Sequence, residues 1–312
     1  MSWSLYRWIW QLESPVHVGM APAGSINRCR LYVPARVFWG AITAELARQK
    51  AAAQFPDYQQ IGNEIKNCVR FTYLYPAEKS GDLWHAWLPQ YECGSGLVWR
   101  REDDSQQECL PDWDFRMRLL HTRPGTAIDP LSATAEEGSL RETECMNTFW
   151  REMDGRASSP VGLVGYVFLK KTDSSSSADL KLPDDLQSLH TLFVGGDTRY
   201  GLGKLRRVGK LDVASNIFGQ LVELRGEEPV VRSARVLAHA SDAPSGMRGS
   251  REALRGWDDG KQETAGTDGE PLWVPGSVAR DGAARFRMDR DGIWHMKDED
   301  TSKSPANGGT ET

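Results

Sequence analysis

The chain has 312 residues, a formal net charge of -5, a sequence pI of about 5.8 and a mean hydropathy of -0.52. These values predict a soluble acidic protein and exclude a bulk electrostatic attraction to nucleic acid. Five scattered cysteines with neither a Cys-x-x-Cys pair nor a secretory signal predict a reducing, cytoplasmic location. No apolar run approaches the roughly 18 residues of a membrane span, so we expect no membrane contact.

The average charge hides two basic segments. No acid lies between Glu13 and Glu45, and Arg28, Arg30 and Arg36 fall inside that window. The second segment, GGDTRYGLGKLRRVGK at 195–210, has one acid, Asp197, against five cations: Arg199, Lys204, Arg206, Arg207 and Lys210.

The first half of the chain predicts a strand, a loop, a helix and a hairpin. Residues 3–12 are aromatic and β-branched and end at the breaker Ser14-Pro15, which favours a strand. A loop rich in small residues follows, and apolar residues at helical spacing after Pro34 predict a helix of about four turns. Residues 68–76 and 82–89 are interpreted as two strands of a hairpin. Polar, irregular sequence over about 90–160 is interpreted as an insertion.

The second half continues with VGLVGYVFLKK at 161–171 as a strand, a flexible connection at 172–179 and a short helix over 184–193. The glycine-rich loop and a strand over 204–213 complete the pattern. The order of strand, helix, strand, insertion, strand, helix and strand predicts an α+β fold of the ferredoxin-like, split βαβ type over residues 1–213. We expect 214–297 to be a partly irregular extension, ordered only at 272–276 and 286–296, and 298–312 to be a disordered tail.

The glycine-rich loop fails both known phosphate fingerprints. Arg206 stands where a dinucleotide motif needs its third glycine, and Leu205 stands where a Walker A loop needs its hydroxyl residue. What remains is glycine backbone that can approach a ligand, cations for phosphates and Tyr200 for stacking, a composition typical of single-stranded RNA binding. The alternative is a turn leading into a solvated basic strand.

Two residues are candidates for catalysis. His17 lies in the acid-free window and would suit a general base, because the ordinary pKa of the histidine side chain lies near working pH. Asp129-Pro130 with nearby acids could carry metal chemistry, although an Asp-Pro turn in a solvated acidic loop explains the same residues. The six histidines are too scattered to predict a metal site, and no cofactor is expected.

Three segments together resemble the RAMP superfamily of CRISPR effector proteins, especially those of type III systems. The segments are SPVHVGMAPAGSINRCRLYVPARVFWGAI, TAIDPLSATAEEGSLRETE and FVGGDTRYGLGKLRRV. They correspond to the family's entry into its first helix, its thumb-like segment and its C-terminal glycine-rich loop. Two departures are clear: Pro34-Ala35-Arg36 replaces the family's Pro-Gly-Ser phrase, and residues 14–44 lack the acid that slicing subunits carry after the first strand. The phrase LWVPGS at 272–277 suggests a degenerate second ferredoxin-like part within 214–297.

The resemblance implies an RRM-like, ferredoxin-like fold whose partners are CRISPR RNA, other Cas subunits and, as a further candidate, target RNA. We therefore favour a non-catalytic subunit that holds the guide RNA at its 5′ handle or at a terminal part of the complex. The alternatives are an endoribonuclease that slices target RNA or processes CRISPR RNA through His17 or Asp129, and an assembly partner that never touches RNA. The residues expected at the RNA are His17, Gly19, Arg28, Arg30, Arg36, Gly195, Gly196, Arg199, Tyr200, Gly201, Gly203, Lys204, Arg206 and Arg207.

Overall fold

The structure is a computed structural model of the full chain. It describes residues 1–51, 55–103, 109–152, 159–171, 181–241, 246–258, 263–266, 270–280 and 282–297. The expected flexible connection at 172–179 and disordered tail at 298–312 lie outside the described residues. Strands and a few helices mix within the chain, which confirms the α+β class. Of the helices that the structure describes, none has the length and apolar character needed to cross a bilayer.

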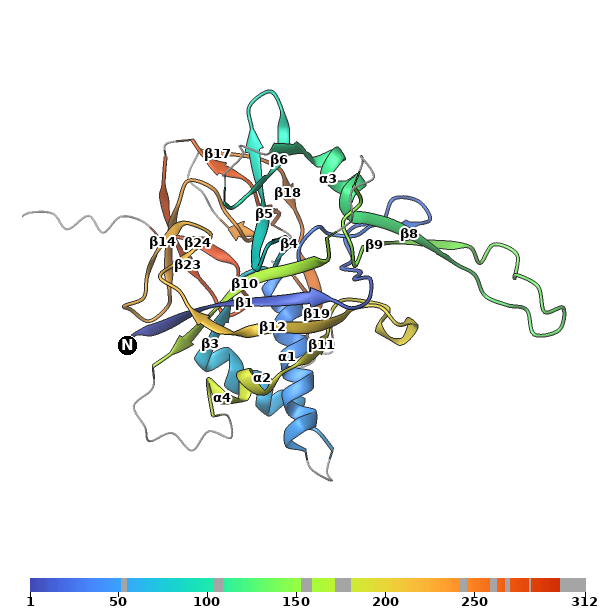
Figure 1. The fold of residues 1–312 in the computed structure, drawn as a ribbon, viewed down its shortest axis with the longest axis horizontal. Coiled ribbons are helices and arrows are strands. Elements are labelled where there is room, and N and C mark those ends of the chain that lie inside the picture. The colour runs from blue at the N-terminus through green and yellow to red at the C-terminus, as the bar shows by residue number, and fades with distance from the viewer. Residues whose placement is uncertain are drawn as a thin grey trace, which may run out of the picture.

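A nine-stranded sheet forms the centre of the molecule (Figure 1). The strands at the centre of this sheet pair antiparallel. β1 lies between β12 and β10, and β10 pairs on its other side with β3 and β4. In spatial order its strands are β11 (Thr191–Phe193), β12 (Lys204–Val213), β1 (Trp3–Leu12), β10 (Val161–Lys170), β4 (Tyr75–Ser80), β5 (Leu83–Glu92), β6 (Gly96–Arg101) and β7 (Cys109–Pro111), and β3 (Val69–Phe71) also pairs with β10.

Helices cover one face of this sheet. In β1 the buried residues Trp8 and Trp10 alternate with half-buried ones, so both indoles lie on the same face. Both rings contact Phe38 of α1 edge-on, with centroids 5.7 and 6.1 Å apart. The helices are α1 (Ala35–Lys50), α2 (Tyr58–Cys68), α3 (Asp112–Leu119) and α4 (Asp184–Ser188), with a 3-10 turn η1 (Thr198–Tyr200).

The local sequence explains α1. Pro34 precedes it with φ of -59°, and Phe38, Ile42 and Leu46 repeat every fourth residue to form its buried stripe. Arg48 and Lys50 lie in its last turn, where cations interact favourably with the helix dipole.

A second, eight-stranded sheet is built from the C-terminal part of the chain. Its strands are short and join segments that are distant in sequence. In spatial order they are β13 (Asn216–Ile217), β14 (Gln220–Glu223), β15 (Val230–Ser233), β23 (Ala284–Met288), β24 (Trp294–Met296), β16 (Ala240–Ser241), β21 (Leu272–Trp273) and β18 (Arg251–Glu252). Two further pairs are β17 (Met247–Arg248) with β22 (Val278–Ala279), and β19 (Arg255–Asp258) with β20 (Glu263–Gly266).

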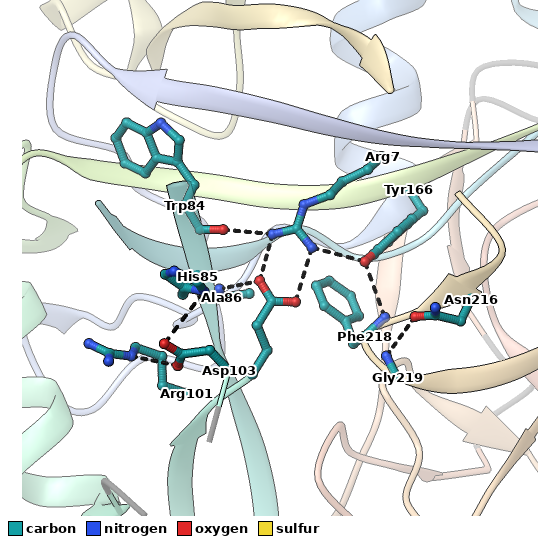
Figure 2. Close-up of polar contacts among 11 residues, drawn as sticks. Arg7, Trp84, His85, Ala86, Arg101, Asp103, Tyr166, Asn216, Phe218 and Gly219 are labelled. Carbon is teal, nitrogen blue, oxygen red and sulfur yellow. Dashed lines mark hydrogen bonds and ion pairs between the residues drawn. The ribbon is translucent and has the colours of Figure 1, made fainter. Parts of the chain in front are cut away.

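The C-terminal part covers the other face of the central sheet, and Arg7 lies at this contact (Figure 2). Its guanidinium donates to both Glu102 carboxylate oxygens, at 2.5 and 3.0 Å, and to the Tyr166 hydroxyl at 3.0 Å. That hydroxyl accepts the backbone N–H of Phe218 at 3.3 Å, and the Phe218 ring packs edge-on against Tyr166 at 4.9 Å. Because both faces are covered, β10 is buried along almost its whole length, as its continuous apolar sequence predicts.

A third, three-stranded sheet consists of β2 (Ile26–Asn27), β9 (Arg141–Met146) and β8 (Leu120–Gly125). Strands β8 and β9 and the residues between them extend away from the body of the molecule, and we call residues 120–146 the arm (Figure 1). The arm contains the segment that the RAMP resemblance identifies as thumb-like.

Several elements differ from the sequence-based predictions. The helix α2 ends at Cys68, so the expected strand over 68–76 divides into β3 and β4. The expected helix over 184–193 ends at Ser188 and is followed by β11. Residues 90–160 contain β6, β7, α3, β8 and β9 instead of irregular chain, and 216–241 form β13 to β16 where we expected no order.

Candidate nucleic-acid interface

The loop after β1 and the glycine-rich loop contact each other through their backbones. The backbone N–H of Gly196 donates to the His17 carbonyl at 2.9 Å, and that of Gly203 donates to the Pro15 carbonyl at 2.8 Å. Gly195 has φ of +78°, and a Cβ there would lie 2.1 Å from the His17 carbonyl oxygen. Gly195 is therefore required for the packing of one loop against the other.

The other glycines of this loop have different surroundings. Gly203 has φ of +84°, and a Cβ there would lie 2.2 Å from the Val194 carbonyl oxygen. Gly201 also has a left-handed φ, +82°, but no heavy atom lies within 4 Å of where its Cβ would be. Close backbone packing thus explains why Gly195 and Gly203 cannot carry a side chain, whereas at Gly201 only the turn geometry requires a glycine.

The base of the arm joins both loops. The Nδ1 atom of His17 lies 2.7 Å from the Glu144 carbonyl oxygen, and the Glu144 carboxylate accepts the Cys29 backbone N–H at 2.9 Å. Val16 and Met146 exchange two backbone hydrogen bonds at 3.1 and 2.8 Å. The three segments that resemble the RAMP superfamily, although far apart in the sequence, therefore meet at one place.

Tyr200 and Arg141 form the exposed part of this junction. The Tyr200 ring is 65% exposed, and the Arg141 guanidinium carbon lies 5.2 Å from its centroid. Arg199 is also exposed, and it forms no hydrogen bond or ion pair with the residues that the structure describes. The surface thus offers an aromatic ring beside two guanidinium groups.

The cations of β12 are partly neutralised. Lys204 and Arg206 both pair with Glu13, at 3.0 and 2.8 Å, and both are about half exposed. Arg207 donates to the Gln187 carbonyl oxygen, near the end of α4. One acid for two exposed cations leaves this strand with a positive surface beside the glycine-rich loop.

The Arg30 side chain contacts the C-terminal part of the chain instead of the glycine-rich loop. This side chain is only 9% exposed and pairs with Glu252 of β18, and the same carboxylate lies 2.6 Å from Nε2 of the buried His239. The Tyr73 hydroxyl lies 2.7 Å from the other ring nitrogen of His239. Because the carboxylate accepts, Nε2 carries the proton of the neutral ring and Nδ1 accepts from Tyr73. Arg30 thus links the loop after β1 to the C-terminal part.

The environment fixes the charges in this cluster. Burial lowers the pKa of His239, which keeps the ring neutral. Burial alone would raise the pKa of Glu252, but hydrogen bonds from His239 and Arg30 outweigh it and lower that pKa to about 2. The structure therefore holds an ionised Arg30–Glu252 pair against a neutral imidazole.

The remaining predicted residues lie along the edge of the loop after β1. Gly19 is exposed and pairs with Cys29 in an isolated bridge, and Arg28 is half-buried next to it. Arg36 lies in the first turn of α1 and is half-buried.

Asp129 lies in the turn at the far end of the arm. One of its carboxylate oxygens accepts the Leu131 N–H at 2.9 Å and the other accepts the Ser132 hydroxyl at 2.8 Å. These hydrogen bonds lower the pKa of Asp129. The geometry is that of the turn expected as the alternative to a metal ligand. Over the described residues, no three His, Cys, Asp or Glu side chains are grouped as a metal site would require.

Sequence reasoning did not single out Arg141 or Glu144. Both lie inside the segment identified as thumb-like, but a cation and an acid in a polar hairpin are common there. Their importance comes from pairing with Tyr200 and His17, 59 and 127 residues away in the chain. No periodic pattern could have indicated these contacts.

No protein-family model matches the sequence, and the search of curated proteins found no relative. The chain is similar to chains in cryo-EM structures of the Type III-B Cmr-beta complex. For the complex bound to cognate target RNA and AMPPnP, identity is 13% and the TM-score 0.49, covering 88% of this chain and 86% of that chain. For the complex bound to cognate target RNA alone, the identity is 12% and the TM-score 0.49, and the match covers 88% of this chain and 86% of that chain. For the apo state, the identity is 12% and the TM-score 0.41, and the match covers 66% of this chain and 96% of that chain.

Proposed function

We propose that the chain is a non-catalytic subunit of a type III CRISPR effector and that it binds CRISPR RNA at the junction of the three segments. The observation that carries this proposal is the convergence itself. His17, Gly196 and Glu144 are joined by hydrogen bonds of 2.9 and 2.7 Å, although they belong to three separate motifs of the RAMP resemblance. The RNA would be held at its 5′ handle or at a terminal segment of the complex.

The arrangement of the central strands supports a ferredoxin-like unit within residues 1–213. The antiparallel order β12, β1, β10 and then β3 with β4, with α1 packed on one face, is what a split βαβ unit requires. In that fold the open sheet face is a common place for RNA. Here Phe218 and the second sheet cover that face, so we place the RNA at the loop edge instead.

Two kinds of contact are available to RNA at this edge. The Tyr200 ring offers a face on which a base can stack, and Arg141 and Arg199 offer positive charge for phosphates. Arg206 and Lys204 continue the positive surface along β12. Arg30 is not part of the proposed contact, because Glu252 neutralises it in a buried position.

The test separates the contribution of base stacking to RNA affinity from the contribution of charge. Binding of a labelled CRISPR RNA to the full-length chain is measured by fluorescence anisotropy between low and high salt. We expect Tyr200→Ala to weaken binding by about five- to a hundredfold without changing the salt dependence. Arg141→Ala should reduce the slope of log affinity against log salt by about 0.7, because one phosphate contact is lost.

The matched control is Arg232→Ala. Arg232 is an exposed cation on β15, in the second sheet and away from the arm. Its loss should leave both affinity and slope unchanged. Equal effects of Arg141→Ala and Arg232→Ala, or an affinity that does not depend on salt, would contradict the proposal and favour the assembly role.

One observation favours the ribonuclease alternative. A carbonyl oxygen only accepts, so Nδ1 of His17 donates to the Glu144 carbonyl, and in the neutral ring Nε2 is the nitrogen that can accept a proton. Incubation of CRISPR RNA and target RNA with the purified chain and with the assembled complex separates the two functions. We expect both RNAs to stay intact; cleavage that is lost in His17→Gln or Asp129→Ala would replace our proposal.

A further inference from the structure

A cavity of about 310 Å³ lies where the loop after β1, the β5–β6 hairpin, α3 and the C-terminal part meet. This volume is at the lower end of the range for ligand sites in proteins. The half-buried residues Met20, Leu97 and Val274 line it, one from each of three separate parts of the chain. None of these residues belongs to the surface proposed for RNA.

The charged groups that line the cavity leave one cation in excess. Arg30 pairs with Glu252, and Arg116 pairs with Asp112 at 2.7 Å. Arg251 is the fifth charged residue of the lining. It is exposed, lies over the Trp273 ring at 4.3 Å, and pairs with no carboxylate among the described residues. The cavity therefore favours a ligand that carries a negative charge.

The aromatic residues of the lining are already stacked. Trp99 is 1% exposed and lies flat on Phe115, with centroids 4.2 Å apart and planes at 9°. Tyr32 is stacked on Tyr73 at 5.6 Å. A nucleobase needs a free aromatic face or directed base-edge contacts, and aliphatic walls suit it poorly. The aliphatic residues of the lining therefore favour an aliphatic side chain as the occupant of the cavity.

An exposed apolar surface lies next to the cavity. Trp113 and Met117 of α3 are 71% and 47% exposed, and they follow directly on the cavity-lining residues Asp112 and Arg116. Residues four apart lie on one face of a helix, so this pair forms a continuous apolar strip along α3. A ligand that covers both the cavity and the strip must be larger than one small molecule.

We propose that the cavity and the α3 strip form a docking surface for a segment of a partner protein, in which an aliphatic side chain enters the cavity and an adjacent carboxylate pairs with Arg251. The aliphatic walls select the apolar anchor and the unpaired guanidinium selects the acid. This inference goes beyond the proposed function, because it stands whether or not the chain binds RNA.

The test uses the full-length chain with ¹³C-labelled methyl groups on Leu, Val and Met. A blocked peptide with two leucines followed by two aspartates is titrated in, and the methyl signals are followed by NMR. We expect saturable shifts at Leu97 and Val274. Arg251→Ala should weaken the affinity by about tenfold, because a charge-assisted contact is lost. Arg48→Ala, which removes an exposed cation of α1 outside the cavity, should leave the affinity unchanged.

Two further probes decide between ligand classes. The same peptide with lysines in place of the aspartates, and adenosine monophosphate, should leave both methyl signals in place. Equal shifts by the lysine peptide would overturn the role of Arg251, and shifts by the nucleotide alone would assign the cavity to nucleic acid. Absence of any shift with the aspartate peptide would remove the docking surface. Each variant is first shown to keep the thermal midpoint of the parent, so misfolding does not enter the comparison.

Discussion

Gly195 and Gly201 share a left-handed backbone but differ in the space around them. Their φ angles are +78° and +82°, yet a Cβ at Gly195 would lie 2.1 Å from the His17 carbonyl oxygen and one at Gly201 would meet nothing within 4 Å. The two positions therefore separate backbone strain from steric contact. We expect Gly201→Ala to lower the free energy of unfolding by about 1 kcal/mol, the cost of a left-handed residue.

Gly195→Ala should cost roughly 3 kcal/mol or more, because the loop after β1 must also move away from the new methyl group. Urea denaturation of both variants gives the difference. RNA affinity provides a second readout, since only Gly195→Ala displaces His17 from the glycine-rich loop. Equal destabilisation by the two substitutions would mean that the loops are not held as tightly as the geometry indicates.

At the scale of single residues, the sequence predicted where the glycine-rich loop lies but not what its glycines contact. The positive φ angles follow from residue type, since glycine adopts them at no steric cost. That Gly195 faces the His17 carbonyl depends on how two distant loops pack. Arg30 illustrates the same limit: it stands in a basic window, but its partner Glu252 is 222 residues away. Local charge does not reveal such a pair.

At the scale of elements, the arm is the segment that most clearly stands apart from the body. Its outer residues, 126–139, form their described hydrogen bonds among themselves, including Thr126 with Ser139 at 2.6 Å and Asp129 with Leu131 at 2.9 Å. Ile128 and Leu131 are 60% and 97% exposed. Little of the core therefore depends on the end of the arm.

Replacing residues 127–138 by a short Gly-Ser turn should change the free energy of unfolding by about 0.5 kcal/mol or less. We expect the same variant to keep its CRISPR RNA affinity, because the proposed contacts at Tyr200 and Arg141 lie outside the replaced residues. Circular dichroism melts and anisotropy titrations check both parts. A strongly lowered thermal midpoint would show that the arm stabilises the body, contrary to its contacts.

Elements with strong local patterns were predictable, and those without were not. The strand β1 follows from its aromatic and β-branched residues and the breaker Ser14-Pro15, and the helix α1 from apolar residues at helical spacing. The second sheet has strands of two to five residues, too short to show a period. Its pairs also join distant segments, such as β15 with β23, so their order depends on tertiary contacts.

At the scale of the whole molecule, the N-terminal and C-terminal parts are joined through buried polar groups. Arg7 links the central sheet to the segment around Phe218 through Tyr166 (Figure 2). Arg30 and Tyr73 make a second link through Glu252 and His239. A buried ion pair tolerates loss of a partner poorly, because the remaining charge is left without compensation. These links should make the two parts unfold together.

The Arg30–Glu252–His239 cluster makes this coupling sensitive to acid. The folded pKa of Glu252, about 2, lies below its ordinary value of 4.5. Above pH 4.5 the carboxylate is ionised in both states, and its contribution to stability is complete. Between pH 4.5 and 2 the unfolded chain takes up a proton that the folded chain does not, so the free energy of unfolding falls by an amount on the order of 3 kcal/mol.

His239 acts in the same direction. Burial lowers its pKa, so the unfolded chain binds a proton below pH 6.5 while the folded chain stays neutral. Urea denaturation at a series of pH values from 7 to 3, followed by tryptophan fluorescence, should show stability decreasing steadily with acid. Glu252→Gln should destabilise the chain at neutral pH by about 3–5 kcal/mol, since Arg30 loses its partner, and should flatten the dependence below pH 4.5.

The control for this prediction is Glu223→Gln. Glu223 pairs with Arg285 across β14 and β23, but its side chain is 46% exposed, so solvent screens the pair. We expect this variant to keep both the stability of the parent within about 1 kcal/mol and its decrease at low pH. If Glu252→Gln also keeps the full decrease below pH 4.5, the acid sensitivity comes from carboxylates elsewhere in the chain, and the cluster does not couple the two parts.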